Sequence, residues 1–197
     1  MRSNVFYLFC GLTGSGKTTL AYSFAQSRRL AYLDYDTVVQ PLLSEIERRG
    51  GIGDSRAAFY RSWRPSCYES FWNTASEILS TGSSLVASAP CGQEIEDETF
   101  FSRLKDKAKR DFDAVGVYLA PQRDFHYEMM KRRNAIWNDD IIPNWNEYCL
   151  KHIPHKPKWD ADWNIYLEYS SFEELSTRFS EAMSPVLAAQ KVEGVTE

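Results

Sequence analysis

Continuous apolar runs alternate with amphipathic stretches along this chain. Such runs are typical of strands buried on both faces of a parallel sheet, and here they cover residues 4–10, 30–34, 85–89, 114–119 and 164–168. The helical periodicity between them covers residues 17–27, 68–82, 97–110 and a last stretch opened by the capping box Ser171 to Glu174. This alternation predicts an α/β fold with a three-layer, doubly wound, five-stranded parallel sheet, whose ligands bind beyond the carboxyl ends of its strands.

Two polar regions interrupt the pattern and are interpreted as lid and substrate insertions. Residues 41–65 begin at Pro41 and contain the Gly-rich break at residues 50–53, so we expect only short helical pieces there. Residues 122–157 combine clustered basic side chains with Trp. A chain of 197 residues is short for two domains. We expect one domain over residues 1–189 and a frayed tail at 190–197.

The turn between the first strand and the first helix matches the phosphate-binding signature G-x-x-x-x-G-K-[ST], the Walker A motif or P-loop. In such a loop, successive backbone N–H groups point at a phosphate, and the positive end of the following helix helps to hold its charge. Lys17 is expected to reach the β- and γ-phosphate oxygens, and Thr18 to ligate Mg²⁺. The predicted nucleotide-binding residues are Gly11, Leu12, Thr13, Gly14, Ser15, Gly16, Lys17, Thr18 and Thr19.

Two acids, Asp34 and Asp36, end the second predicted strand. From this position a carboxylate can help to position Mg²⁺ and can accept a proton from an incoming hydroxyl. An aspartate here can also simply cap the helix that follows. We assign the base role to Asp36, beside the acceptor, and a supporting metal-site or structural role to Asp34.

With these residues the chain resembles the small P-loop kinases that include zeta toxins, polynucleotide 5′-kinases, chloramphenicol phosphotransferase and gluconate kinase. The resemblance rests on residues 11–19 and on Leu33-Asp-Tyr-Asp-Thr37, which is similar to the D-x-D-T element of zeta toxins. In that element the second acid, here Asp36, is the base. Many relatives carry an acid at the end of the third strand, where this chain has Ser88. That difference argues against a switch or motor ATPase.

The resemblance also implies a lid that brings arginine to the transferred phosphoryl group. The candidates are Arg132 and Arg133, on a predicted helix with Met129 and Ile136. Adjacent helical residues lie about 100° apart, so one can face the nucleotide while the other meets solvent. A solvated charge run is the alternative interpretation. Arg123 is the weakest candidate, because it lies close to the end of the preceding strand.

Arg56, Arg61 and Arg64 lie among aromatic residues in a region where small kinases hold the acceptor. Guanidinium groups pair with carboxylate or phosphate, and aromatic rings stack on planar groups. These arginines are therefore the predicted substrate-binding residues, together with Asp36. The same composition also suits a packed surface.

The charge and cysteine content restrict the partners and the compartment. The net charge of −4 argues against a large surface for tracking nucleic acid. The first apolar run is too short to span a bilayer and leads directly into the P-loop without a cleavage site, so we expect neither a signal peptide nor a membrane partner. The widely spaced Cys10, Cys67, Cys91 and Cys149 are expected to be reduced thiols in the cytoplasm.

Together these features predict an ATP- and Mg²⁺-dependent kinase that transfers the γ-phosphate to a hydroxyl group of a small molecule. A second hypothesis makes the acceptor a nucleic-acid hydroxyl, at a 5′ end or on a hydroxymethylated base. A third is a regulatory or toxin-type protein that binds ATP without turnover.

Overall fold

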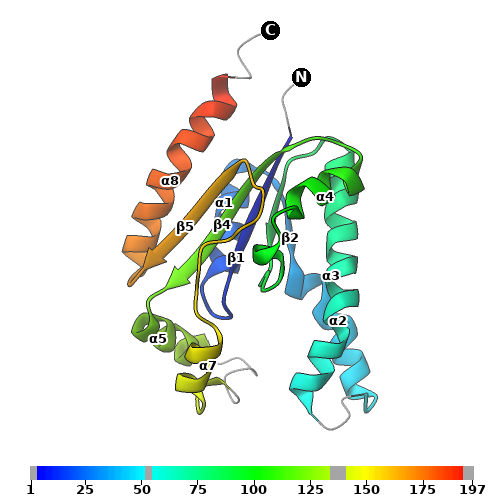
Figure 1. Cartoon of the computed structure of the whole chain (residues 1–197), viewed down its shortest axis with the longest axis vertical. Coiled ribbons are helices and arrows are strands. Elements are labelled where there is room, and N and C mark those ends of the chain that lie inside the picture. Colours follow the sequence, from blue (N-terminus) through cyan, green and yellow to red (C-terminus); the bar gives the residue numbers. More distant parts are fainter. Residues whose placement is uncertain (1–3, 52–54, 134–140, 193–197) are drawn as a thin grey trace.

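A five-stranded parallel sheet forms the centre of the molecule, as the sequence predicts (Figure 1). The computed structural model describes residues 4–51, 55–133 and 141–192. The strand order is β2-β3-β1-β4-β5, which puts the first strand in the middle. The strands are β1 (Val5–Gly11), β2 (Ala31–Asp34), β3 (Leu85–Ser88), β4 (Asp113–Pro121) and β5 (Trp163–Tyr169).

Helices cover both faces of the sheet because the central strand is apolar on both sides. Phe6 and Leu8 of β1 pack in the cluster that contains α3 and α4, whereas Tyr7 and Phe9 pack in the cluster that contains α1 and α8. No helix in the described ranges is both long enough and apolar enough to cross a bilayer. The helices are α1 (Lys17–Arg28), α2 (Tyr35–Arg48), α3 (Arg56–Ser80), the 3₁₀ turn η1 (Glu94–Glu96), α4 (Phe100–Ala108), α5 (Arg123–Arg133), α7 (Trp145–Lys151) and α8 (Phe172–Val192).

The predicted short helical pieces at residues 41–65 are wrong, because α2 runs through Pro41 and α3 begins at Arg56 and runs through Pro65. A proline inside a helix costs about 3 kcal/mol. The two helices compensate by packing together: Val39 and Leu43 of α2 share a buried cluster with side chains of α3. Burying one such aliphatic side chain contributes about 1.5–3 kcal/mol. Tertiary packing therefore outweighs the local helix-breaking signal.

Helix α8 is longer than predicted. Its first turn is capped as the sequence suggests, with the Glu174 backbone N–H donating to Ser171 Oγ at 3.1 Å. Its last turns continue to Val192, into the segment expected to fray. The Tyr7 hydroxyl donates to Gln190 Oε1 at 2.6 Å and so ties this end of the helix to the central strand. Residues 193–197 of the predicted tail lie outside the described residues.

The prediction of reduced thiols is wrong for Cys10 and Cys91, which form a disulfide. Strands β1 and β3 are neighbours and run in parallel, with Phe9 opposite Ser88. The residues that follow these two positions therefore come together at the same edge of the sheet, and the two Cα atoms are 5.8 Å apart. Cys67 and Cys149 are free thiols. The bond fastens the start of the P-loop to the segment after β3.

Reduction of this bond is expected to lower the free energy of unfolding by about 2–5 kcal/mol, because the bond closes a long loop in the unfolded chain. The measurement is a denaturant titration with and without reductant. Alkylation of the unfolded chain should modify two cysteines before reduction and four after it. The Cys10→Ala variant should lose nothing further when reductant is added. Four alkylated cysteines without reductant would contradict the assignment.

Candidate active site

The P-loop follows the central strand and opens helix α1. Gly14 and Gly16 both have φ +77°, a left-handed conformation that favours glycine. Gly16 is the N-cap of α1 and has no side chain with which to cap it. The N–H groups of the first turn therefore stay available to an anion. A Cβ atom on Gly14 would meet the Met130 thioether, so a side chain at this position would force Met130 to shift.

A cavity of about 640 Å³ lies beside this loop. It brings Lys17 together with Asp36 from α2 and with the two arginines at the end of α5, from three elements that are distant in sequence. An apolar part is formed by Leu20 of α1 and by residues of α8. The lining residues are Gly14, Gly16, Lys17, Thr18, Thr19, Leu20, Ser23, Asp36, Met129, Arg132, Arg133, Phe172, Leu175 and Ser176.

The charges of Lys17 and Asp36 influence one another across this cavity. Burial lowers the pKa of Lys17 to about 8, against the opposing effect of Asp36. The Lys17 ammonium donates to the Leu12 carbonyl at 3.3 Å. Asp36 faces the open cavity, and the loss of hydration between its walls raises the pKa of its carboxyl, with Lys17 acting in the opposite direction. A raised carboxyl pKa is the shift that a general base requires.

Asp34 uses its two carboxylate oxygens differently. Oδ1 accepts the Thr37 backbone N–H at 3.0 Å and thereby caps α2. Oδ2 accepts from the Ser88 hydroxyl at 2.6 Å and lies 3.5 Å from Thr18 Oγ1. The Tyr32 hydroxyl, 2.9 Å from Ser88 Oγ, completes this cluster. Asp34 thus combines the capping role with a position beside the P-loop threonine.

Ser88, at the position where the resemblance predicts an acid in many relatives, ends β3 beside the last residue of β2. Asp34 is the register partner of Ser88. A carboxylate on the neighbouring strand therefore reaches the same point in space, and the buried Ser88 hydroxyl orients it. Asp34 of β2 thus places a carboxylate beside Ser88 of β3.

Arg132 and Arg133 both line the cavity, although only one of them was expected to face it. They occupy the last two positions of α5. Arg133 lies close enough to lower the pKa of Asp36, opposing the larger effect of burial. Arg123 instead donates to Asn146 Oδ1 of α7. Ile136, predicted to share the helix, lies outside the described residues.

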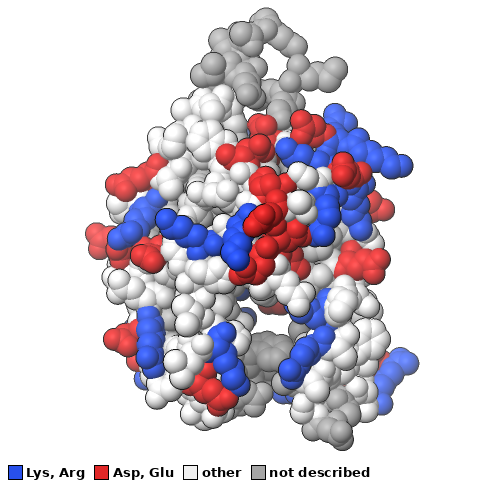
Figure 2. All heavy atoms as spheres, in the orientation of Figure 1, with Lys and Arg blue, Asp and Glu red and all other residues white. Residues whose placement is uncertain are grey.

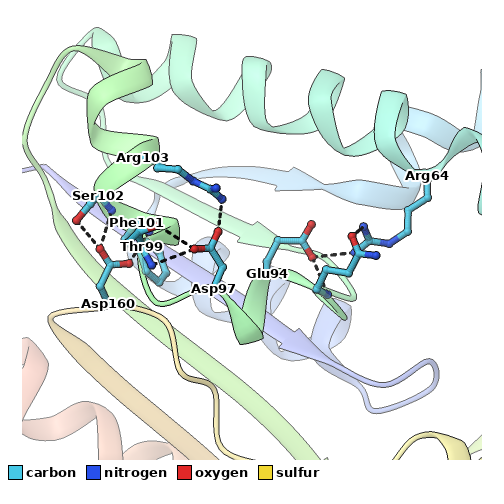
Figure 3. A network of polar contacts seen from close by, with 9 residues as sticks. Arg64, Glu94, Asp97, Thr99, Phe101, Ser102, Arg103 and Asp160 are labelled. Carbon is cyan, nitrogen blue, oxygen red and sulfur yellow. Dashed lines mark hydrogen bonds and ion pairs between the residues drawn. The ribbon is translucent and has the colours of Figure 1, made fainter.

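The three predicted substrate-binding arginines lie on α3 and, within the described chain, do not line this cavity. Arg56 Nε donates to Glu47 Oε1 at 2.7 Å, and Arg61 is exposed. Arg64 donates to Glu94 Oε2 at 2.9 Å (Figure 3). Its guanidinium carbon also lies 4.1 Å from the centre of the Tyr68 ring. Arg64 therefore fixes the 3₁₀ turn after β3. Contact of these residues with an acceptor stays a prediction.

Two buried side chains that touch the P-loop were not identified from the sequence. His126 of α5 lies with Nε2 2.7 Å from the Thr13 carbonyl oxygen. The Tyr169 hydroxyl at the end of β5 donates to the Ser15 carbonyl. These partners are 113 and 154 residues away from the loop. No local motif marks contacts of this range.

The fold and the loop together define a P-loop protein with the fold of small kinases. A sequence profile of the family described as "AAA domain" matches residues 6–136. The chain therefore belongs to this family. No curated protein matches it by sequence.

Solved structures support the class at the level of the fold. A protein from Chloroflexus aurantiacus, provisionally named a kinase, has a TM-score of 0.67 at 19% identity, covering 97% of this chain and 98% of that one. A gluconokinase from Sinorhizobium meliloti has a TM-score of 0.54 at 12% identity, covering 100% and 98%. Shikimate kinase from Bacteroides thetaiotaomicron has a TM-score of 0.53 at 17% identity, covering 92% and 98%.

Proposed function

We propose that this protein is an ATP-dependent kinase that transfers the γ-phosphate to a hydroxyl group of a small molecule. The observation that carries the proposal is the meeting of Lys17, Asp36 and the arginine pair of α5 in one cavity beside the P-loop. Each part matches a requirement of phosphoryl transfer: a cradle for the phosphates, a base for the hydroxyl, and cations for the developing charge.

In the proposed reaction, Asp36 accepts the proton of the acceptor hydroxyl as its oxygen forms a bond to the γ-phosphorus. The bond between this phosphorus and the β–γ bridging oxygen breaks, and ADP leaves with the bonding electrons. Lys17 and the P-loop amides hold the β- and γ-phosphates. Arg132 and Arg133 offset the charge on the transferred group.

The residues around Thr18 suit Mg²⁺. The Thr18 hydroxyl and Asp34 Oδ2 are oxygen donors 3.5 Å apart, and Mg²⁺ prefers oxygen ligands. Thr18 would hold the ion directly, and Asp34 would hold it through water. When bound, Mg²⁺ neutralises phosphate charge.

The basic side chains beside an opening below the sheet support an anionic acceptor. Figure 2 shows two lobes there, formed by α5 and α7 on one side and by the ends of α2 and α3 on the other, with Lys and Arg side chains bordering the opening. Both acidic and basic side chains lie on the rest of this face (Figure 2). This mixture and the net charge of −4 favour a compact anionic acceptor over a nucleic acid.

The test is a panel of hydroxylated acceptors with ATP and Mg²⁺, read as phosphorylated product by ³¹P NMR. Product with a small acceptor supports the proposal. Transfer to oligonucleotides, with a salt-sensitive gel shift, would favour the nucleic-acid alternative. ATP binding without product across both sets would favour the regulatory alternative.

Binding of ATP above pH 8 is expected to take up a proton. In the free protein the pKa of Lys17 is about 8, so the amine is partly neutral at pH 8.5. Bound phosphates favour the ammonium and raise that pKa, so affinity should fall as the pH rises through 8. Calorimetry in buffers of different ionisation enthalpy measures the uptake, which should become smaller as the pH falls below 8, because Lys17 is then already charged before ATP binds. The Lys17→Arg variant should take up no proton at this position above pH 8, because the guanidinium group is always charged.

A further inference from the structure

The P-loop is contacted by buried side chains from two elements that are distant in sequence. His126 is 3% exposed and Met130 is fully buried, and they lie four residues apart on one face of α5. Met130 occupies the space in which a Cβ atom on Gly14 would lie. His126 Nε2 contacts the Thr13 carbonyl. Because a carbonyl oxygen can only accept, Nε2 carries the proton.

Tyr169 makes the corresponding contact two residues further along the loop. Its ring is fully buried, and its hydroxyl donates to the Ser15 carbonyl. The two hydrogen-bonded carbonyls, of Thr13 and Ser15, belong to the residues directly before Gly14 and Gly16. Both glycines have φ +77° and line the cavity.

Peptide geometry links these contacts to the cavity. In a planar trans peptide, the carbonyl of one residue and the N–H of the next point in opposite directions. A Thr13 carbonyl held toward α5 therefore turns the Gly14 N–H away from α5. In the same way, the bond from Tyr169 sets the direction of the Gly16 N–H. Backbone N–H groups arranged in this way form an anion-binding nest.

We propose that His126 and Tyr169 are positioning residues that preset the Gly14 and Gly16 amides for the phosphates of the nucleotide. The inference rests on the proposed nucleotide binding and deepens it. Neither side chain lines the cavity within the described chain. They act through the loop carbonyls, by holding the free loop in the conformation that binds phosphate.

The protonation state of His126 agrees with this role. Burial lowers its pKa, and the nearby charge of Lys17 acts in the same direction. The ring is therefore neutral near pH 7 and has one N–H group, which donates a hydrogen bond to the Thr13 carbonyl. A neutral ring also adds no charge to the phosphate site.

The experiment compares His126→Phe, which keeps a ring but removes the donor, with His126→Gln, which keeps an N–H donor. Affinities for ADP and adenosine are measured by competition with a fluorescent ATP analogue. His126→Phe is expected to weaken ADP binding about 10-fold, the effect of about one hydrogen bond to a charged group, and to leave adenosine binding unchanged. His126→Gln should restore most of the loss. Tyr169→Phe, which removes one hydroxyl, should also weaken ADP binding selectively.

Exposed residues of the same types supply the controls. His155→Phe and Tyr22→Phe should bind ADP as the wild type does. ADP binding by His126→Phe and Tyr169→Phe equal to that of the wild type would overturn the inference, and so would an equal loss of ADP and adenosine affinity. If the wild type itself bound no ADP, the proposed function would fail first. Amide NMR shifts of Gly14 and Gly16, which should move on ADP addition and be altered in the donorless variants, provide a second readout.

Discussion

Asp36→Asn is expected to slow phosphoryl transfer strongly while leaving ATP binding nearly unchanged. Asparagine keeps the size of the side chain at the cavity wall but cannot take a proton from the acceptor. Loss of a general base typically costs about 10²- to 10⁴-fold in rate. Turnover should therefore fall by that factor, measured as kcat with the best acceptor at saturating ATP.

The matched control is Asp106→Asn, an exposed aspartate of α4, which should leave kcat unchanged. The wild-type rate should decline at acid pH, because a carboxylate must be ionised to act as a base and the pKa of Asp36 is raised. That decline should disappear from the residual activity of the variant. Unchanged turnover in Asp36→Asn would assign proton abstraction to another group.

Lys17→Ala is expected to impair both nucleotide binding and turnover. The ammonium lies within the loop and is the cation positioned for the β- and γ-phosphates. Loss of a hydrogen bond between charged groups costs about 1.5–3 kcal/mol, so ATP affinity should fall about 10- to 150-fold. Turnover should fall further, by about 10²- to 10³-fold, because the charge on the transferred group also loses its partner. Calorimetry and steady-state kinetics measure the two effects.

The melting temperature of Lys17→Ala shows whether the loss of activity comes from the missing ammonium or from unfolding. The pKa of Lys17 is lower in the folded protein than in the unfolded chain, so the unfolded chain binds the proton more tightly. Below pH 8 the charged Lys17 therefore lowers the free energy of unfolding. This destabilising effect is relieved as the pH rises from 8 toward 10.5. Lys17→Ala should consequently melt at or above the wild-type temperature at pH 7. Lys107→Ala, at an exposed position of α4, is the activity control. Near-native ATP binding by Lys17→Ala would contradict the P-loop assignment.

The sequence predicts those parts of the molecule whose signals are local. Apolar runs mark the strands, since strands buried on both faces need continuous hydrophobicity. The P-loop is readable because its glycines and Lys17 lie within eight residues. The acids after β2 are readable because a strand end points to the ligand edge of the sheet.

Contacts between distant segments could not be predicted in this way. The Cys10–Cys91 bond spans 81 residues and depends on which strand neighbours β1. The lateral placement of Asp34 beside Ser88 depends on the same strand order. Arg64 carries the sequence pattern of a ligand-binding residue, but its carboxylate partner is Glu94, thirty residues later. Composition cannot distinguish an arginine that awaits a ligand from one that already has an ion pair.

The strand order gives the P-loop and the two acids different numbers of neighbouring strands. The phosphate loop extends from β1, which is paired on both sides, whereas Asp34 and Asp36 extend from β2, a four-residue strand at the margin that pairs only with β3. The strand that carries the acids therefore has fewer neighbours to hold it than the strand that carries the phosphate loop. Because fewer ladder hydrogen bonds protect it, β2 should open more often than β1, and amide hydrogen exchange should be faster in β2 than in β1.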